Sequence, residues 1–595
     1  MMDRSLQSGR IIRNTFYAQF LSYLIASLTA TLGSLIDGVI IGQYFGVESI
    51  AAFGIVNPLI LVLSLMGPIL ASGARSRFVW LIGSGKSREA QNVFSLSCIL
   101  AGGVAAVVSV AAIALSGPIV FLLGARGNAA SLLPMAQAYL IAIAIGMPFR
   151  SVMWILWAFV PIDNDRGLPI FASVVMTVSN VLLDFTVVFL GGGTFGLGLA
   201  TSLSYLLAFL TLLFHFLKKN TFVRFSFKGI SIKETKKMLE EGTPTAIHQL
   251  GNTARGIFMN HLLVIVAGTT AIASYSVYGH AESLMLPLAA GIADTVSAIV
   301  GILTGEEDRP MIKILFQTSV RASFLFTTLL AALFFLFAPQ FASLFVKNDA
   351  EALRLSIRAV RAYAIGMPLH GLNLIYKDYL HGIGKIKLAA ASGFLTECGF
   401  LILTASILVK YIGADAVWFA FPITQILMLV YFIVLIVVGS CRLGIRSGGI
   451  WNKMLLLPDR FDVKKENCLD RTVTTMKEVS ELSCEVWNFC DAHGCDKRRR
   501  YMMSLAVEEM VGNVILHGFS KDTKLHSVDV RVMCKGDDYI IRIRDDCRIF
   551  DPVNRLKLYS DEDPSHHIGL RLTIKTAKKV RYTSVLKLNN LFIKV

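Results

Sequence analysis

Apolar runs of about twenty residues recur from Phe16 to about Gly439, and they limit the possible folds more than any other feature. Each run is long enough to cross the ~30 Å hydrocarbon core of a bilayer as a helix, and we count roughly twelve of them. With 54% hydrophobic and only 16% charged residues, the chain cannot be a soluble enzyme throughout. The sequence predicts an all-α polytopic membrane protein.

The character of the chain changes after Cys441, where charged residues become frequent and long apolar runs stop. We therefore expect a soluble domain, here called the tail domain, joined to the membrane part by a short linker. The expected boundaries are 1–220 for a first lobe, 221–241 for a basic linker, 242–445 for a second lobe, 446–465 for a second linker and 466–595 for the tail domain.

Basic residues crowd alternate short loops of the membrane part, as in the stretch from Arg75 to Arg88 and again from Lys218 to Lys237. Loops rich in Lys and Arg stay on the cytoplasmic side, so both termini are predicted to be cytoplasmic. The first apolar run continues without a clear cleavage site, which indicates a retained helix. Anionic lipid is a sufficient partner for the net charge of +16, and no nucleic acid is needed to explain it.

The membrane part contains an internal repeat. Gly46 and Gly268 lie 222 residues apart, as do Gly83 and Gly305, and the string AIGMP occurs twice with a shift of 220. Two homologous halves of about six helices each follow from this, an arrangement that builds transporters whose two halves rock about a site near the membrane midplane.

The two halves differ in their polar residues. Asp37 lies within an apolar helix, where an ionisable group costs several kcal/mol and by default faces an ion or proton path. Asn180 and Asp184 are four positions apart and share a helix face. Their oxygens suit Na⁺, and neighbouring carboxylates can also carry a proton near neutral pH. The alternative is that these groups lie near helix ends and reach the interface. The corresponding second-half positions are Met259, Phe400 and Thr404.

At these residues the chain resembles the multidrug and toxic compound extrusion (MATE) family of cation-coupled antiporters. The matching text is LIDGVIIGQYFGVESIAAFG, GSGKSREAQNVFS and SNVLLDFTVVF. The resemblance implies a bacterial cytoplasmic-membrane protein that exports organic cations or other amphipathic compounds against H⁺ or Na⁺. It assigns Asp37, Asn180 and Asp184 to the cation or proton site, with Thr201 as a neighbour. The second-half acids Glu282, Asp294 and Glu397 match no family motif.

A lipid-linked precursor flippase of the same broader superfamily is an alternative function. Such a protein needs cationic residues in its central cavity to bind a pyrophosphate. The only candidates are Arg150, Arg255 and His261.

The tail domain shows helical spacing at 467–491, 497–517 and 568–578, with strand-like alternation at 527–533 and 539–544 and closing strands near 583–587 and 591–595. This order predicts an α/β sandwich. Glu509, Asn513 and His517 recur every fourth residue and therefore face one way. Taken alone, such a stripe is most often a solvated helix face.

The segments AVEEMVGNVILHG, IRIRDDCRIFDP and HIGLRLTI, in this order, resemble the GHKL ATPases, specifically the anti-sigma-factor serine kinases. The resemblance implies Mg-ATP as ligand, with Glu509 as general base and Asn513 as Mg²⁺ ligand. It also implies that Asp545 is the adenine reader, the acid that accepts a hydrogen bond from the adenine amino group, and that Gly569 belongs to the lid on the phosphate side. It also implies a sigma factor or STAS-type anti-anti-sigma protein as partner. A membrane-tethered kinase or sensor is therefore a further alternative.

Three glycines of the GHKL pattern are replaced, by Cys547, Ile549 and His567. Glycine at such places lets the backbone approach a nucleotide, and side chains obstruct that approach. We therefore expect weak ATP binding, little or no kinase turnover, and a regulatory domain that favours the inward-open state of the transporter.

Overall fold

The computed structural model describes residues 9–44, 46–123, 131–218, 221–226, 232–346, 349–445, 449–519, 525–552 and 568–595. The first lobe is a bundle of long helices, with α2 to α8 in chain order. They are α2 (Arg10–Tyr44), α3 (Gly46–Gly83), α4 (Ser87–Ala114), the short α5 (Ser116–Leu122), α6 (Leu133–Phe159), α7 (Gly167–Leu190) and α8 (Gly193–Leu213). These segments satisfy their backbone hydrogen bonds internally, as a chain in hydrocarbon must.

The second lobe repeats this arrangement. It contains α9 (Ile232–Gly305), α10 (Arg309–Leu336), α11 (Ala338–Ser343), α12 (Ala350–Gly382), α13 (Ile386–Phe394), the π-helical turn η3 (Leu395–Gly399), α14 (Phe400–Tyr411), the turn η4 (Ala414–Phe419) and α15 (Ala420–Arg442). Although α9 is continuous over 74 residues, Arg255 and Glu282 within it form an ion pair of 2.8 Å. A straight helix would separate them by about 40 Å, so α9 reverses direction between them and contributes two antiparallel limbs.

Within the described residues, nine helices are long and apolar enough to cross a membrane. Three further segments lie in the bundles beside them: α2 with 35 residues, α12 with 33 residues and the first limb of α9. Together these segments account for the dozen apolar runs of the sequence. The expected all-α membrane fold in two lobes is confirmed.

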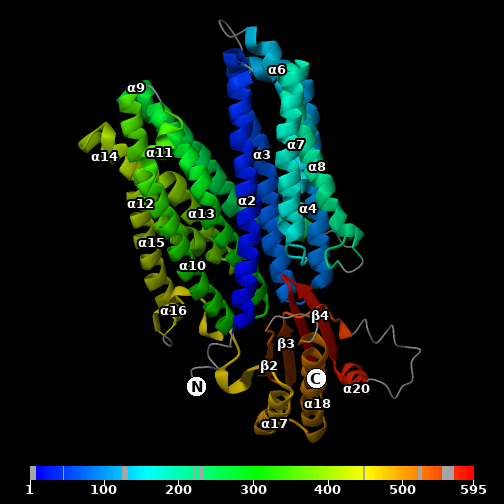
Figure 1. The fold of residues 1–595 in the computed structure, drawn as a ribbon. Coiled ribbons are helices and arrows are strands. Elements are labelled where there is room, and N and C mark those ends of the chain that lie inside the picture. The colour runs from blue at the N-terminus through cyan, green and yellow to red at the C-terminus, as the bar shows by residue number, and fades with distance from the viewer. Residues whose placement is uncertain are drawn as a thin grey trace.

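The two lobes meet at one end, next to the tail domain, and diverge at the other end (Figure 1). We call these the tail-side end and the far end. At the tail-side end α3 and α9 touch through glycine, since a Cβ at Gly83 would lie 2.1 Å from the Ile302 carbonyl oxygen, and one at Gly305 would lie 2.5 Å from that of Trp80. The two glycines that the repeat relates thus lie against each other.

Ion pairs reinforce this contact between the lobes. Arg75 of α3 contacts Asp294 of α9 at 2.6 Å, and Arg77 contacts Glu234 at 2.8 Å. The lobes are therefore closed against each other at the tail-side end.

The tail domain is a five-stranded antiparallel sheet with helices on one face. Its elements are β1 (Cys468–Val473), α17 (Met476–Ala492), α18 (Lys497–Asn513), the π-helical turn η7 (Val514–Gly518), β2 (Val528–Lys535), β3 (Asp538–Asp545), α20 (Ile568–Thr576), β4 (Lys579–Val585) and β5 (Leu588–Lys594). The strand order is β1-β2-β3-β5-β4. The helices cover the sheet face that points away from the membrane helices (Figure 1). The expected α/β sandwich is confirmed.

The connection between the second lobe and the tail domain is anchored. It contains α16 (Gly449–Met454) and two single turns, η5 (Asp459–Phe461) and η6 (Lys465–Asn467). Tyr376 and Tyr379 of α12 donate their hydroxyls to the carbonyls of Met454 and Leu455, at 2.9 and 2.7 Å. The tail domain is therefore held near the second lobe from its first residues.

Candidate functional site

Asn180 and Asp184 form one polar pair on α7. The Asn180 amide donates to a carboxylate oxygen of Asp184 at 3.3 Å, which is the contact that their i, i+4 spacing predicts. The Asp184 side chain is fully buried within the first lobe. A buried carboxylate at this depth is a candidate for binding and releasing a cation or proton.

The backbone places Asp37 at the same level as this pair. On α2, a Cβ at Gly33 would lie 2.7 Å from the Thr177 hydroxyl of α7, and Tyr44 makes a ring contact with Phe185. Asp37 comes one turn after Gly33, and Asn180 comes about one turn after Thr177. The side chain of Asp37 lies outside the described residues.

Thr201 of α8, the expected neighbour of this site, donates its hydroxyl to the Leu197 carbonyl of its own helix at 3.1 Å.

The second lobe contains a buried charged cluster that the sequence analysis did not assemble. Arg255 contacts Glu282 at 2.8 Å and Glu397 at 3.3 Å. His248 lies 3.7 Å from the second of these carboxylates. Glu397 belongs to the π-helical turn η3, a local irregularity that is frequent at functional positions. The signal available in the sequence was an arginine within an apolar segment, which requires acidic partners.

In the tail domain, Glu509 and Gly569 lie against each other. A Cβ at Gly569 would be 2.1 Å from the carboxyl carbon of Glu509, so no larger residue fits there in this arrangement. The first turn of α20 therefore contacts the Glu509 carboxylate, which is half-buried. Asn513 is the last residue of α18, one turn after Glu509, and η7 follows directly.

Asp545, the last residue of β3, is buried and is held by neutral donors. The Asn589 amide donates to its carboxylate at 2.8 Å and the Cys547 backbone N–H at 2.9 Å. Burial raises the pKa of Asp545 to about 6, against the lowering effect of these hydrogen bonds. The carboxylate is thus ionised at neutral pH and can accept a hydrogen bond from an amino group.

Two of the residues that replace the expected glycines are described. The Cys547 side chain packs against Gly518, where a Cβ would meet its sulfur at 3.1 Å, and Ile549 is exposed. His567 lies outside the described residues.

The fold and these sites define a two-lobed membrane transporter joined to an ATPase-like sheet domain. The MatE family model matches residues 23–186 and 244–407, one match in each lobe, and the model described as "Histidine kinase-like ATPase domain" matches residues 473–593. The chain therefore belongs to the MatE family of multidrug efflux transporters and carries a C-terminal GHKL-like domain.

Curated relatives support the same family. The "Multidrug export protein MepA" of Staphylococcus saprophyticus is 23% identical over 61% of this chain and 80% of its own length. The "Probable multidrug resistance protein YoeA" of Bacillus subtilis is 22% identical over 67% of this chain and 88% of its own.

Solved structures share the fold of the membrane part. An "Outward-facing conformation of a multidrug resistance MATE family transporter of the MOP superfamily" has a TM-score of 0.66 at 22% identity, covering 70% of this chain and 94% of its own. A MOP superfamily transporter from Pyrococcus furiosus, described as having a binding pocket of reverse polarity, has a TM-score of 0.65 at 22% identity, with the same coverage.

Proposed function

We propose that this chain is a secondary antiporter of a bacterial cytoplasmic membrane. It exports organic cations or other amphipathic compounds against H⁺ or Na⁺, and both of its termini are cytoplasmic. The observation that carries the proposal is the buried Asn180–Asp184 pair on α7, at the level of Asp37 on α2. The names of the multidrug relatives support the class of substrate.

The orientation is supported by charge. The tail-side ends of the helices carry the basic residues Arg75, Arg77, Lys86 and Arg88, and basic loops stay on the cytoplasmic side. The far end is then external, and the structure corresponds to an outward-facing state.

Efflux of ethidium from proteoliposomes with an imposed pH or Na⁺ gradient tests the proposal. Wild-type protein should respond to at least one gradient, and Asp184→Asn should respond weakly. Glu351→Gln, which removes a carboxylate from the exposed first turn of α12, serves as the control and should leave transport unchanged. Equal gradient-driven efflux by Asp184→Asn and wild-type protein would exclude Asp184 from coupling.

The lipid-linked precursor flippase is the weaker alternative. Its central cation, Arg255, is already paired with the carboxylates of Glu282 and Glu397, and the Arg150 guanidinium stacks on the Tyr205 ring at 5.5 Å. An arginine neutralised by two acids gains little by binding a pyrophosphate.

For the tail domain we propose weak Mg-ATP binding with Asp545 as adenine reader and Asn513 as Mg²⁺ ligand, and a regulatory role in place of kinase turnover. The contact between Gly569 and the Glu509 carboxylate supports this, because a general base must reach the group that it deprotonates and Gly569 occupies one side of that carboxylate. A sigma factor or STAS-type protein is the proposed partner class. If the full-length chain phosphorylates a serine of a partner protein, the alternative of a membrane-tethered kinase is correct instead.

A further inference from the structure

The sheet face opposite the tail helices carries charge and is buried against the transporter. In β2 and β3 alternate residues point to opposite faces, so Val530, Val532 and Ile543 pack against the tail helices. The other face carries Arg531, Arg542 and Arg544 among its residues, and all three are buried. Three buried guanidinium groups require acidic partners.

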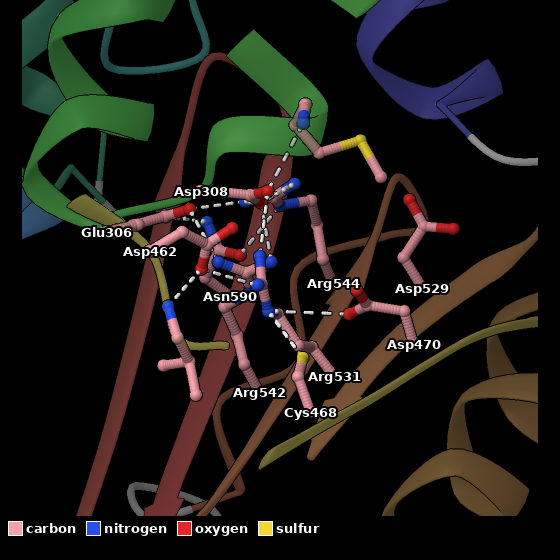
Figure 2. Close-up of polar contacts among 12 residues, drawn as sticks. Glu306, Asp308, Asp462, Cys468, Asp470, Asp529, Arg531, Arg542, Arg544 and Asn590 are labelled. Atoms are coloured by element: carbon pink, nitrogen blue, oxygen red, sulfur yellow. Dashed lines mark hydrogen bonds and ion pairs between the residues drawn. The ribbon is translucent and has the colours of Figure 1, made fainter. Parts of the chain in front are cut away.

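The second lobe supplies these partners from the short loop between α9 and α10. Arg531 contacts Asp308 at 3.0 Å, Arg542 contacts it at 2.5 Å, and Arg544 pairs with Glu306 (Figure 2). Asp308 is 1% exposed and also accepts from the Met311 backbone N–H at the start of α10. Burial raises the pKa of Asp308, but the three arginines outweigh it and hold the pKa at about 2, so Asp308 stays ionised.

The first lobe holds the same sheet at its other edge. The Leu586 N–H, in the turn between β4 and β5, donates to the Ile162 carbonyl at 2.7 Å, and Arg166 donates to the Leu586 carbonyl at 2.6 Å. Asn164 donates to the Ser584 carbonyl at 2.9 Å and accepts from the Lys587 N–H. Leu586 is fully buried in the core of the membrane part.

The receiving loop of the first lobe is internally fixed. Asp163 is buried and accepts hydrogen bonds from the backbone N–H groups of Phe222 and Val223, at 2.8 and 2.9 Å, and lies 2.8 Å from the His215 ring. Next to it, the loop after α3 approaches β4 so closely that a Cβ at Gly85 would overlap the Arg581 guanidinium. The sheet therefore docks on a formed surface of the first lobe.

We propose that the tail sheet is a clamp that joins the tail-side ends of both lobes and holds the transporter closed at that end. One sheet is bonded to the α6–α7 loop of the first lobe and to the α9–α10 loop of the second. Alternating access requires the lobes to separate at the tail-side end, so at least one of these contacts must break before the transporter opens there. For this consequence the clamp rests on the proposed transporter function.

This direction is opposite to the one expected from the sequence, which predicts that the tail domain favours the inward-open state. The clamp stabilises the state in which α3 and α9 touch at Gly83 and Gly305, and that state is closed on the tail side.

The proposed nucleotide site lies directly behind the clamp. Asp545 follows Arg544 on β3, and Asn589 precedes Asn590 on β5. Asp545 and Asn589 bond to each other on the helix-covered side, whereas the Asn590 amide contacts Glu306 at 3.3 Å. A ligand or partner that shifts β3 and β5 from the helix side therefore also moves the groups that hold the second lobe.

Hydrogen exchange of the full-length chain in lipid nanodiscs tests the clamp without requiring a substrate. The first variant is Arg531→Gln combined with Arg542→Gln. The matched control is Arg498→Gln, which changes an exposed arginine on α18. The exchange rate of residues 306–308 measures docking of the tail sheet. The exchange rates of residues 78–83 and 300–305 measure the contact between the lobes. In the double variant we expect all three segments to exchange about tenfold faster or more, with the control unchanged.

A second variant places the change in the transporter. Asn164→Gly keeps the positive φ of 67° accessible and removes the side-chain bonds to the β4–β5 turn, so it acts even if the double arginine variant fails to fold. It should accelerate exchange of residues 78–83 and 300–305 by a smaller factor.

Two outcomes would overturn the clamp. In one, residues 306–308 lose protection in the double arginine variant while residues 78–83 and 300–305 keep wild-type exchange in both variants. In the other, residues 306–308 keep wild-type exchange in the double arginine variant. Hydrogen exchange is measured without transport. A result against the proposed antiporter function would therefore not change the outcome of this test.

Discussion

The two lobes arise from one repeat, yet their carboxylates within the membrane have different partners. In the first lobe Asp184 receives a hydrogen bond from the neutral amide of Asn180, whereas in the second lobe Glu282 and Glu397 are held by the guanidinium of Arg255. A neutral donor leaves the charge on a carboxylate free to change, but a buried arginine fixes it. This contrast supports the proposal that the first lobe carries ion coupling and that the Arg255 cluster of the second lobe is structural.

The interface between the second lobe and the tail domain, together with the tail domain itself, repeats this contrast outside the membrane-spanning helices. Asp308 is held by three arginines and its pKa falls to about 2, whereas Asp545 is held by an amide and a backbone N–H and burial raises its pKa to about 6. The type of donor thus separates fixed carboxylates from those that can titrate near neutral pH.

Removing the first-lobe charge should have the largest effect. Asp37→Asn is expected to reduce gradient-driven ethidium efflux to the background of protein-free liposomes, because the carboxylate proposed to bind and release the coupling ion is lost. Asp184→Asn should lose less, since Asp37 remains. Both variants should keep the thermal unfolding midpoint of wild-type protein within a few degrees. Wild-type efflux in Asp37→Asn would contradict the proposal that the first lobe carries ion coupling.

Removing the second-lobe cation should instead affect stability. Arg255→Leu leaves the buried carboxylate of Glu397 and the partly buried carboxylate of Glu282 without their guanidinium, a change that costs about 3–5 kcal/mol. The unfolding midpoint in detergent should fall clearly, and adding Glu282→Gln and Glu397→Gln to the same chain should restore part of it.

Single substitutions of second-lobe acids test separately whether this lobe takes part in ion coupling. Glu282→Gln, or Asp294→Asn at the contact between the lobes, should alter stability or substrate range more than ion coupling. Uncoupled transport in either variant would show that the second lobe also carries the ion.

The contact between the lobes predicts a smaller effect. Gly83→Ala forces a methyl group to within 2.1 Å of the Ile302 carbonyl oxygen, and Gly305→Ala forces one to within 2.5 Å of the Trp80 carbonyl oxygen. Overpacking of this kind costs about 1–3 kcal/mol, so both variants should lower the unfolding midpoint and lose protection at residues 78–83. The control is Gly54→Ala on the same helix, where a Cβ meets nothing within 4 Å. Equal midpoints for Gly83→Ala and Gly54→Ala would contradict the contact.

The sequence predicted the lobes and the Asn180–Asp184 contact because both follow from spacing along one chain. Hydropathy runs give helices, an offset of about 220 gives the repeat, and four positions give one helix face. The partners of Arg255 could not be predicted, since they come from a reversed limb of α9 and from η3. Spacing within a segment does not specify which segments pack together.

The docked sheet was missed for a related reason. Strand alternation correctly assigns Arg531 and Arg542 to a polar face, and such a face is normally solvated. The structure buries that face against Glu306 and Asp308, two acids in a loop more than two hundred residues away. Alternation predicts which residues share a face of a sheet, but it does not predict what covers that face.

The last prediction concerns the tail carboxylate that can titrate. If Asp545 reads the adenine amino group, it must be ionised to accept that hydrogen bond, so Mg-ATP affinity should fall as pH drops through about 6. The ionised fraction changes about tenfold between pH 7 and pH 5, and calorimetry on the full-length chain should show a matching loss of affinity. A raised carboxyl pKa stabilises the folded domain below the unfolded pKa and loses that contribution as pH rises through about 6, so protonation of Asp545 at pH 5 does not itself destabilise the domain. Asp545→Asn is the control and should bind weakly with little pH dependence, whereas the same pH profile in both proteins would remove Asp545 from nucleotide binding.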